Sequence, residues 1–422
     1  MKIIHTSDWH LGAKLHEEDR SDEHRAFLDW LLGQLKEEKP DALLIAGDIF
    51  DTTAPSASAM KMYHEFVSRA ILEAGCRDIV IIGGNHDSPS WLGMSRPVLE
   101  CLGTHVVPAA EEEFEKECVF VERDGRVALA IAAIPFLREN ELANLVREEN
   151  ETRTHDELVR AGYAEHCRRV VAAARSKAGA APLVMTGHCV LSGSKLSDDT
   201  SERQRGFSGK AVIGGVKSVD FETLPEADYL ALGHLHLPQK VAGRETARYS
   251  GSPIPMSFSE AGSAKQILVV TLGERTGDPV SVVEKPIPCF HALERLEGTP
   301  EEIEARLGEL AKGDAGVFVE IGVTSGEGDL TPWWEKYAAI VSGHSDIKIL
   351  VERDRREKVA AGSGLEAIAV ENGNLATLDE MAVVRARLGE ENLTDEDRTV
   401  FERLLAEVIA EVKAGVDDSD EE

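Results

Sequence analysis

The sequence predicts an α/β fold followed by a smaller α+β part. Short aliphatic runs alternate with amphipathic helical segments over the first part of the chain, which is the pattern of strands and helices in α/β proteins. The pattern changes near Pro286-Ile287-Pro288, where a shorter series of elements begins. A chain of 422 residues can hold two or three domains. We therefore predict a first domain at 1–285 and a second at 286–360.

The first elements form a βαβ unit. Strand Lys2–Thr6 is followed by a helix near Asp22–Glu38 and by strand Asp41–Ala46. A second helix, about Ser56–Ala74, precedes a strand that begins at Ile79. The helical spacing i, i+3, i+4 and i+8 gives the first helix one apolar face, formed by Phe27, Trp30, Leu31 and Leu35.

The next segments predict a hairpin, a helix and a long loop. Val119–Val121 and Val127–Ile134 form the hairpin around the Asp-Gly pair between them. A helix over roughly Glu157–Lys177 then precedes strand Leu183–Met185. Ser192–Lys217 is rich in Ser, Gly and charge, which predicts a loop near the functional site, because long loops inside domains are usually functional or mobile.

The second domain is predicted to be a small α+β unit. Helices at Glu301–Leu310 and Pro332–Val341 alternate with strands at Val317–Val323 and Ile347–Val351. The Gly- and Ala-bearing stretch that follows, 360–374, indicates a linker.

Two amphipathic helices are predicted over 375–414, and the acidic tail 415–422 is predicted to be disordered. The second helix carries an apolar stripe, which we call the C-terminal stripe. It consists of Phe401, Leu404, Leu405, Val408, Ile409 and Val412. The stripe either packs on its own domain or lies in a groove of a partner.

Five predicted strands are each followed by a turn that carries Asp, Asn or His. Turns after buried strands meet at one edge of a sheet, where α/β proteins place their sites. Each turn alone is a weak signal, but together they predict a metal centre. Imidazole ligands disfavour Mg²⁺ and Ca²⁺ and suit Mn, Fe or Zn. The candidate residues are Asp8, His10, Asp48, Asp51, Asn85, His86, Asp87, His188, His234 and His236.

The net charge of −30 is unusual for a protein that binds nucleic acid, because phosphate contacts favour a basic face. We interpret most of the acidity as a surface trait that favours solubility. The alternative is that a partner supplies most of the contacts to nucleic acid, while bound metal ions make the site itself locally positive. The six Cys form no C-x-x-C pair and indicate reduced thiols. The chain opens directly into a strand, and the apolar stretch 127–137 is too short to span a bilayer, so we expect a cytoplasmic protein without a membrane segment.

These motifs resemble those of the calcineurin-like metallophosphoesterases, and among them those of the bacterial SbcD-type nuclease subunits. Three stretches add to the turn motifs: Met1–Gly12, Leu44–Asp51 and Tyr249–Pro253. The resemblance covers nearly the whole chain and is strongest through about Phe258. It implies a β-sandwich flanked by helices, a capping domain at 286–360 and C-terminal helices.

The resemblance also implies a centre of two divalent ions, with Mn²⁺ as the metal. One ion is assigned to Asp8, His10 and His236. The other is assigned to Asn85, His188 and His234. Asp48 would bridge the two, since a carboxylate has two oxygens. His86 would contact the scissile phosphate and protonate the leaving oxygen, with Asp87 orienting it, while Asp51 would support the ligands without binding an ion.

The implied activity is that of a DNA nuclease with a partner. Family members degrade double-stranded DNA from 3′ ends and cleave single strands and hairpins, together with an SbcC-type SMC-like ATPase. This chain has no Gly-x-x-x-x-Gly-Lys-Ser/Thr loop, so we expect the partner to bind ATP and the C-terminal stripe to bind the partner. Family members also form homodimers through nuclease-domain helices. Met60, Tyr63 and Val67 are a candidate face for this contact, unless that face is core.

Two other functions are compatible with the motifs. The same fold hosts phosphodiesterases and phosphomonoesterases of small substrates, although such an enzyme needs neither a capping domain nor terminal helices. A non-catalytic scaffold of the same fold is the second alternative. The complete ligand set and His86 argue against the scaffold.

Overall fold

The computed structural model of the chain describes residues 1–148, 152–195, 218–313, 316–326, 328–344 and 346–356. Residues 1–355 form one compact unit. This unit includes both predicted domains up to residue 355, so the boundary at 285/286 stays a prediction. The C-terminal stripe, the helices predicted over 375–414, the acidic tail and most of the loop predicted at 192–217 lie outside the described residues.

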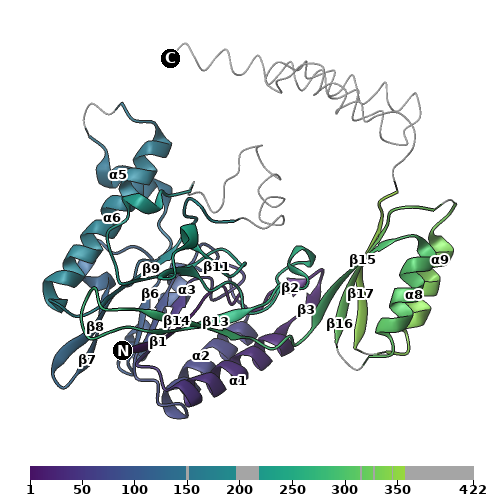
Figure 1. The fold of residues 1–422 in the computed structure, drawn as a ribbon, viewed down its shortest axis with the longest axis horizontal. Coiled ribbons are helices and arrows are strands. Elements are labelled where there is room, and N and C mark those ends of the chain that lie inside the picture. The colour runs from purple at the N-terminus through teal and green to yellow at the C-terminus, as the bar shows by residue number, and fades with distance from the viewer. Residues whose placement is uncertain (149–151, 196–217, 314–315, 327, 345, 357–422) are drawn as a thin grey trace. The chain divides into compact units, whose positions relative to one another are not determined.

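The first sheet has the strand order β14-β13-β1-β4-β5-β6. Its strands are β1 (Lys2–Thr6), β4 (Ala42–Ala46), β5 (Ile79–Ile82), β6 (Thr104–Val107), β13 (Gln266–Thr271) and β14 (Ser281–Pro286). Strands β1, β4, β5 and β6 are parallel to one another. Strand β13 pairs antiparallel with β1, and β14 pairs antiparallel with β13. Helices α1 (Ser21–Glu38) and α2 (Ala57–Leu72) cover one face with a shared apolar core, which confirms the predicted βαβ unit (Figure 1).

The second sheet has the order β11-β12-β10-β9-β8-β7. Its strands are β7 (Cys118–Arg123), β8 (Arg126–Ala132), β9 (Leu183–His188), β10 (Tyr229–Gly233), β11 (Gln239–Lys240) and β12 (Ala247–Tyr249). The predicted hairpin is β7–β8, and its turn places Asp124 and Gly125 in the left-handed region that such turns require. Helices α5 (Glu139–Val146), which was not predicted, and α6 (His155–Ala178) pack on its outer face.

The two sheets pack face to face. Alternate residues of the first sheet, such as Ile3 and Leu44, share a fully buried cluster with Leu129 and Val184 of the second. This alternation is expected when each strand buries one side against a helix and the other against the opposite sheet. The carboxyl ends of β1, β4 and β5 therefore lie beside those of β9 and β10, and the metal-ligand candidates follow these ends.

A smaller α/β unit follows the two sheets. Parallel strands β15 (Ala292–Gly298), β16 (Val317–Val323) and β17 (Ile347–Asp354) carry α8 (Pro300–Leu310) and α9 (Thr331–Val341) on one face, with a core of their own (Figure 1). The four predicted elements of this unit are present, whereas β15 was not predicted. A second small cluster joins this unit to the preceding part of the chain, where Phe258 packs with Leu15, Leu293 and Phe318.

The remaining elements are short. They are the hairpin β2 (Lys14–Leu15) and β3 (Glu18–Asp19), helices α3 (Pro89–Gly93) and α4 (Arg96–Glu100), and the 3₁₀ turns η1 (Phe114–Glu117), η2 (Phe221–Thr223), η3 (Val241–Gly243) and η4 (Phe258–Glu260). The predicted dimer face on α2 is wrong, because Tyr63 and Val67 are buried in the core of the first sheet and Met60 is partly buried against it. Among the residues described, no helix combines the length and hydrophobicity needed to cross a bilayer.

Candidate metal centre

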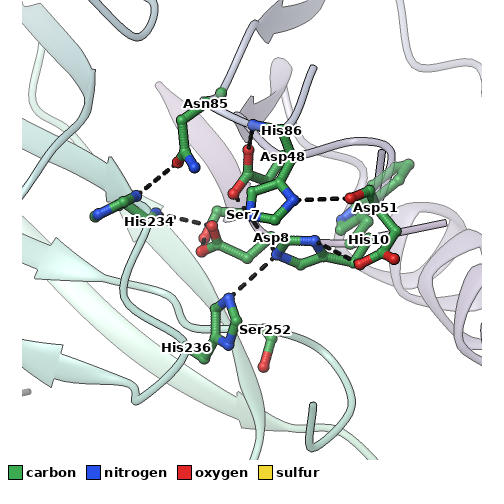
Figure 2. Close-up of polar contacts among 12 residues, drawn as sticks. Ser7, Asp8, His10, Asp48, Asp51, Asn85, His86, His234, His236 and Ser252 are labelled. Carbon is green, nitrogen blue, oxygen red and sulfur yellow. Dashed lines mark hydrogen bonds and ion pairs between the residues drawn. The ribbon is translucent and has the colours of Figure 1, made fainter. Parts of the chain in front are cut away.

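The structure brings the predicted ligands together at the shared edge of the two sheets (Figure 2). The first sheet contributes Asp8 and His10 after β1, Asp48 after β4 and Asn85 after β5. The second contributes His188 at the end of β9, and His234 and His236 after β10. Potential ligand atoms lie within 4.8 Å of one another in three groups: Asp8, His10 and His236; His10, Asp48 and His86; and Asp48, His188 and His234.

Four of these residues have an unusual backbone. The φ angles are 54° at Asp8, 46° at His10, 51° at Asp48 and 93° at His234. Positive φ is unfavourable for residues with a Cβ and concentrates at functional sites, where the surrounding structure must hold it. Hydrogen bonds between the turns do so here: the His10 amide donates to the carbonyl oxygen of Asp48 at 3.0 Å, and the His234 amide donates to Asp8 Oδ1 at 2.8 Å.

The position of His188 depends on a glycine. Its Nδ1–H donates to the carbonyl oxygen of Ala46 at 2.9 Å, across the junction of the sheets. The imidazole passes so close to Gly47 that a Cβ there would lie 2.2 Å from Nδ1. This arrangement turns Nε2 toward the centre, where it lies 3.0 Å from Asn85 Oδ1 and 3.3 Å from Asp48 Oδ2.

These atoms have the character of a cation site. Because Nδ1 of His188 already donates, Nε2 of the neutral ring presents a lone pair to two oxygen acceptors. A proton or a cation must lie among them. Although burial lowers it, the carboxylates of Asp48 and Asp8 raise the pKa of His188 to about 9. Burial raises the pKa of Asp48, but the imidazoles of His188 and His10 hold it well below its usual range. A divalent ion of the transition series suits this mixture of imidazole, carboxylate and amide donors.

The second group of ligands shows the same convergence. His10 Nε2 and His236 Nε2 lie 3.1 Å apart, with their other ring nitrogens turned outward. His236 Nδ1–H donates to Glu260 Oε1 at 3.2 Å. Asp8 Oδ2 accepts from the hydroxyl of Ser7 at 2.5 Å. Asp51 Oδ1 lies 3.4 Å behind His10 Nδ1, a place that fits its predicted supporting role.

His86 lies half-buried beside the ligands (Figure 2). Its amide donates to Asp48 Oδ1 at 2.9 Å, and its Nδ1–H donates to the carbonyl oxygen of Asp51 at 2.7 Å. The ring centroid lies 4.8 Å from that of His10. Nε2 of His86 is thus the ring nitrogen that is not bonded to Asp51.

The structure corrects the expectation for Asp87. We expected this carboxylate to orient His86, but it accepts backbone N–H bonds from Gly84, Ile49 and Phe50 at 2.9–3.1 Å. Burial and the nearby charge of Asp48 raise the pKa of Asp87 to about 6. Asp87 therefore ties together the two turns that carry Asp48 and Asn85, and the carbonyl group of Asp51 orients His86.

Sequence reasoning missed the groups behind His236. Glu260 and Lys265 are 4% and 6% exposed and form a buried ion pair. They lie in a stretch of irregular structure without a metal-ligand motif, so nothing in the residue spacing pointed to them. Ser252, which also contacts this pair, does lie in the Tyr249–Pro253 segment that carried the resemblance.

The comparison with known families agrees with this geometry. The calcineurin-like phosphoesterase family matches residues 1–238. The chain belongs to this family, and the predicted metallophosphoesterase sandwich is confirmed.

Comparison with individual proteins identifies the subgroup of this family to which the chain belongs. The SbcD subunit of the SbcCD nuclease from Escherichia coli (strain K12) is 32% identical, over 96% of this chain and 97% of that protein. The proteins of the same name from Bacillus subtilis (strain 168) and Rhodobacter capsulatus are 37% and 33% identical, over 64% and 74% of this chain and 66% and 77% of their own lengths. The chain is thus a member of the SbcD group of nuclease subunits, which are hydrolases of phosphodiester bonds. A β-glucosidase from Exiguobacterium marinum aligns with 82% of this chain and 85% of its own at 10% identity, but a TM-score of 0.22 is too low to indicate a common fold.

Proposed function

We propose that this chain is a two-metal, manganese-dependent DNA nuclease that degrades duplex DNA from 3′ ends and cleaves single strands and hairpins. The observation that carries the proposal is the convergence of seven candidate ligand side chains from both sheets, with His86 beside them. Asp8, His10 and His236 would hold one ion. Asn85, His188 and His234 would hold the other. Asp48 would bridge the two ions, because its carboxylate lies near His10 of the first ligand set and also near His188 and His234 of the second.

The chemistry then divides between the ions and the protein. When bound at the proposed ligands, two divalent ions would lower the pKa of a water molecule and stabilise the negative charge on the phosphoryl oxygens. His86 would act in its imidazolium form: Nε2–H would give its proton to the leaving oxygen, while Nδ1–H stays hydrogen-bonded to the carbonyl oxygen of Asp51. Asp87 keeps the turns of Asp48 and Asn85 in register through its three backbone contacts.

The test is a cleavage assay with Mn²⁺ on three substrates: blunt duplex, hairpin DNA and a chromogenic phosphodiester. We expect cleavage of both DNA substrates, with loss of duplex from its 3′ ends. Hydrolysis of the chromogenic diester alone would support a small-substrate phosphodiesterase instead. No hydrolysis of any of the three would support the scaffold alternative.

We further propose that an SbcC-type SMC-like ATPase is the partner and that it binds the C-terminal stripe. Deletion of Thr394–Glu422 removes no proposed ligand. Basal cleavage of single strands should therefore survive, while ATP-stimulated processing of duplex ends and co-purification with the ATPase should be lost. If the stripe packs on its own chain instead, the truncated protein will melt at a lower temperature and lose basal activity as well.

We propose that a second copy of this chain covers an apolar patch on α3 and α4. Trp91, Met94, Val98 and Leu102 lie on these two short helices or directly after them and are 43–67% exposed. The hydroxyl of Ser95 donates to His64 Nε2 on α2 at 2.6 Å, because Nδ1–H of His64 donates to the carbonyl oxygen of Met60, and this contact holds the start of α4 against α2. In a chain of charge −30, a patch of apolar side chains is suited to an isologous contact between identical copies.

Light scattering on the size-exclusion eluate tests this contact. Val98→Asp should convert a dimer to a monomer, because it places a charge within the patch. Leu72→Asp is the matched control, since Leu72 is 83% exposed and lies outside the patch. A Val98→Asp variant that stays dimeric would exclude this surface as the interface.

A further inference from the structure

The imidazole of His236 is held from behind by a buried ion pair. Glu260 Oε1 accepts from His236 Nδ1–H at 3.2 Å, and Glu260 Oε2 accepts from the ammonium group of Lys265. The same ammonium group donates to the carbonyl oxygen of His236 at 3.1 Å and to the hydroxyl of Ser252 at 3.0 Å. His236 is thus fixed at its ring and at its backbone by one pair of charges.

The chain also fixes Glu260 itself. Glu260 ends the turn η4, and Phe258 at its start is buried among Leu15, Leu293 and Phe318. The amide of Met256 donates to Glu260 Oε2 at 3.3 Å. A carboxylate anchored in this way has little freedom to leave the imidazole.

A contribution to stability alone does not account for this pair. Removing two charges from water is costly, and buried ion pairs can often be replaced by apolar residues without loss of stability. A carboxylate behind a metal-facing imidazole has a specific effect, since it fixes the tautomer and the ring orientation and raises the basicity of the ligand. Here the contact keeps the proton on Nδ1 and leaves the Nε2 lone pair pointing at His10 Nε2, 3.1 Å away.

We propose that Glu260, supported by Lys265, is a positioning residue that prepares His236 to bind one of the two ions. The inference rests on the proposed ligand role of His236. Glu260 acts through His236, while the ligands at the other ion, Asn85, His188 and His234, do not depend on it.

Titration of the full chain with Mn²⁺ alone tests the proposal, with free Mn²⁺ measured by electron paramagnetic resonance. Wild-type protein should bind two ions. Glu260→Gln has the same shape but can donate to Nδ1, which would move the imidazole proton to Nε2. We expect one ion to bind with unchanged affinity and the other about 10–100-fold more weakly.

Two further variants separate positioning from a general effect on folding. Glu260→Asp keeps a negative charge for Lys265 but withdraws the carboxylate from His236, so it should weaken the same ion. Glu117→Gln is the matched control, because Glu117 is fully buried and contacts the buried His166 at 2.9 Å, away from the centre. It should lower the melting temperature without changing the affinity for either ion.

The possible failures are distinguishable. If both Glu260 variants bind two ions as tightly as the wild type while their melting temperature falls, the Glu260–Lys265 pair only stabilises the local fold, and the inference is overturned. Fewer than two ions on the wild-type chain would overturn the proposed two-metal function, and this inference with it.

Discussion

Gly47→Ala should disturb the metal centre without changing any ligand. Gly47 has φ of +89°, and an added Cβ would lie 2.2 Å from Nδ1 of the fully buried His188. Positive φ with a Cβ costs about 1–2 kcal/mol. Relieving the clash moves the imidazole away from Ala46 and loses a hydrogen bond of about 1 kcal/mol, with about 1–3 kcal/mol for forced repacking. We expect the free energy of unfolding to fall by roughly 3–6 kcal/mol.

Gly125→Ala is the matched control for this variant. Gly125 has φ of +72° in the β7–β8 turn, with nothing within 4 Å of an added Cβ, so it bears the backbone cost alone. Urea unfolding measures both variants, and Mn²⁺ titration measures the centre. Only Gly47→Ala should weaken binding of the ion assigned to His188, by about 10–100-fold, since it removes the contact that orients the ligand. Equal destabilisation of the two variants, with normal Mn²⁺ affinity in both, would refute the argument.

Three other changes have defined outcomes. Asp48→Ala should remove both ions, and metal analysis that finds two ions per chain would contradict the bridging role. His86→Gln should keep the fold and the metal content but lose about 10²-fold or more in nuclease rate, so a near-normal rate on duplex DNA would exclude the general acid. Burial lowers the pKa of His5 to about 3 and that of His24 to about 4, against about 6.5 in the unfolded chain. The unfolded chain therefore binds more protons below about pH 6.5, and the free energy of unfolding should fall from there toward pH 4, by up to about 1.4 kcal/mol per pH unit for each histidine. Urea unfolding across this range should show a smaller slope for His24→Gln, and an unchanged slope would contradict the assignment.

The residues that converge on the centre could be found from the sequence because the fold places strand ends in a fixed way. A buried aliphatic run ends, the next turn carries Asp or His, and parallel strands bring those turns to one edge. This reasoning brought together Asp48 and His188, which are far apart in the chain. It also explains why Leu235, between two ligand candidates, is buried in the core.

The supporting contacts could not be found in the same way. The carboxylate of Asp87 bonds to backbone amides of another turn, and backbone amides leave no signal in a sequence. Glu260 is one of 76 acidic residues and lies at the end of a three-residue 3₁₀ turn that carries no metal-ligand motif. Helices α3 and α4 are too short and too interrupted by Pro and Gly to show a helical period, so their exposed apolar patch was missed while the buried face of α2 was chosen.

The centre lies at the junction of two sheets, so residues that contact no ligand also control the spacing of the ligands. Asp8, Asp48 and Asn85 follow strands of the first sheet, whereas His188 and His234 come from the second. Their separation is therefore set by the packing of one sheet on the other, through side chains that touch no ligand. Tyr229 is one of these: it is fully buried between the sheets, and its hydroxyl donates to His5 Nδ1 at 3.0 Å while His5 Nε2–H donates to the carbonyl oxygen of Leu232. Because interiors are close-packed and transmit strain, a change in this layer moves one half of the ligand set against the other.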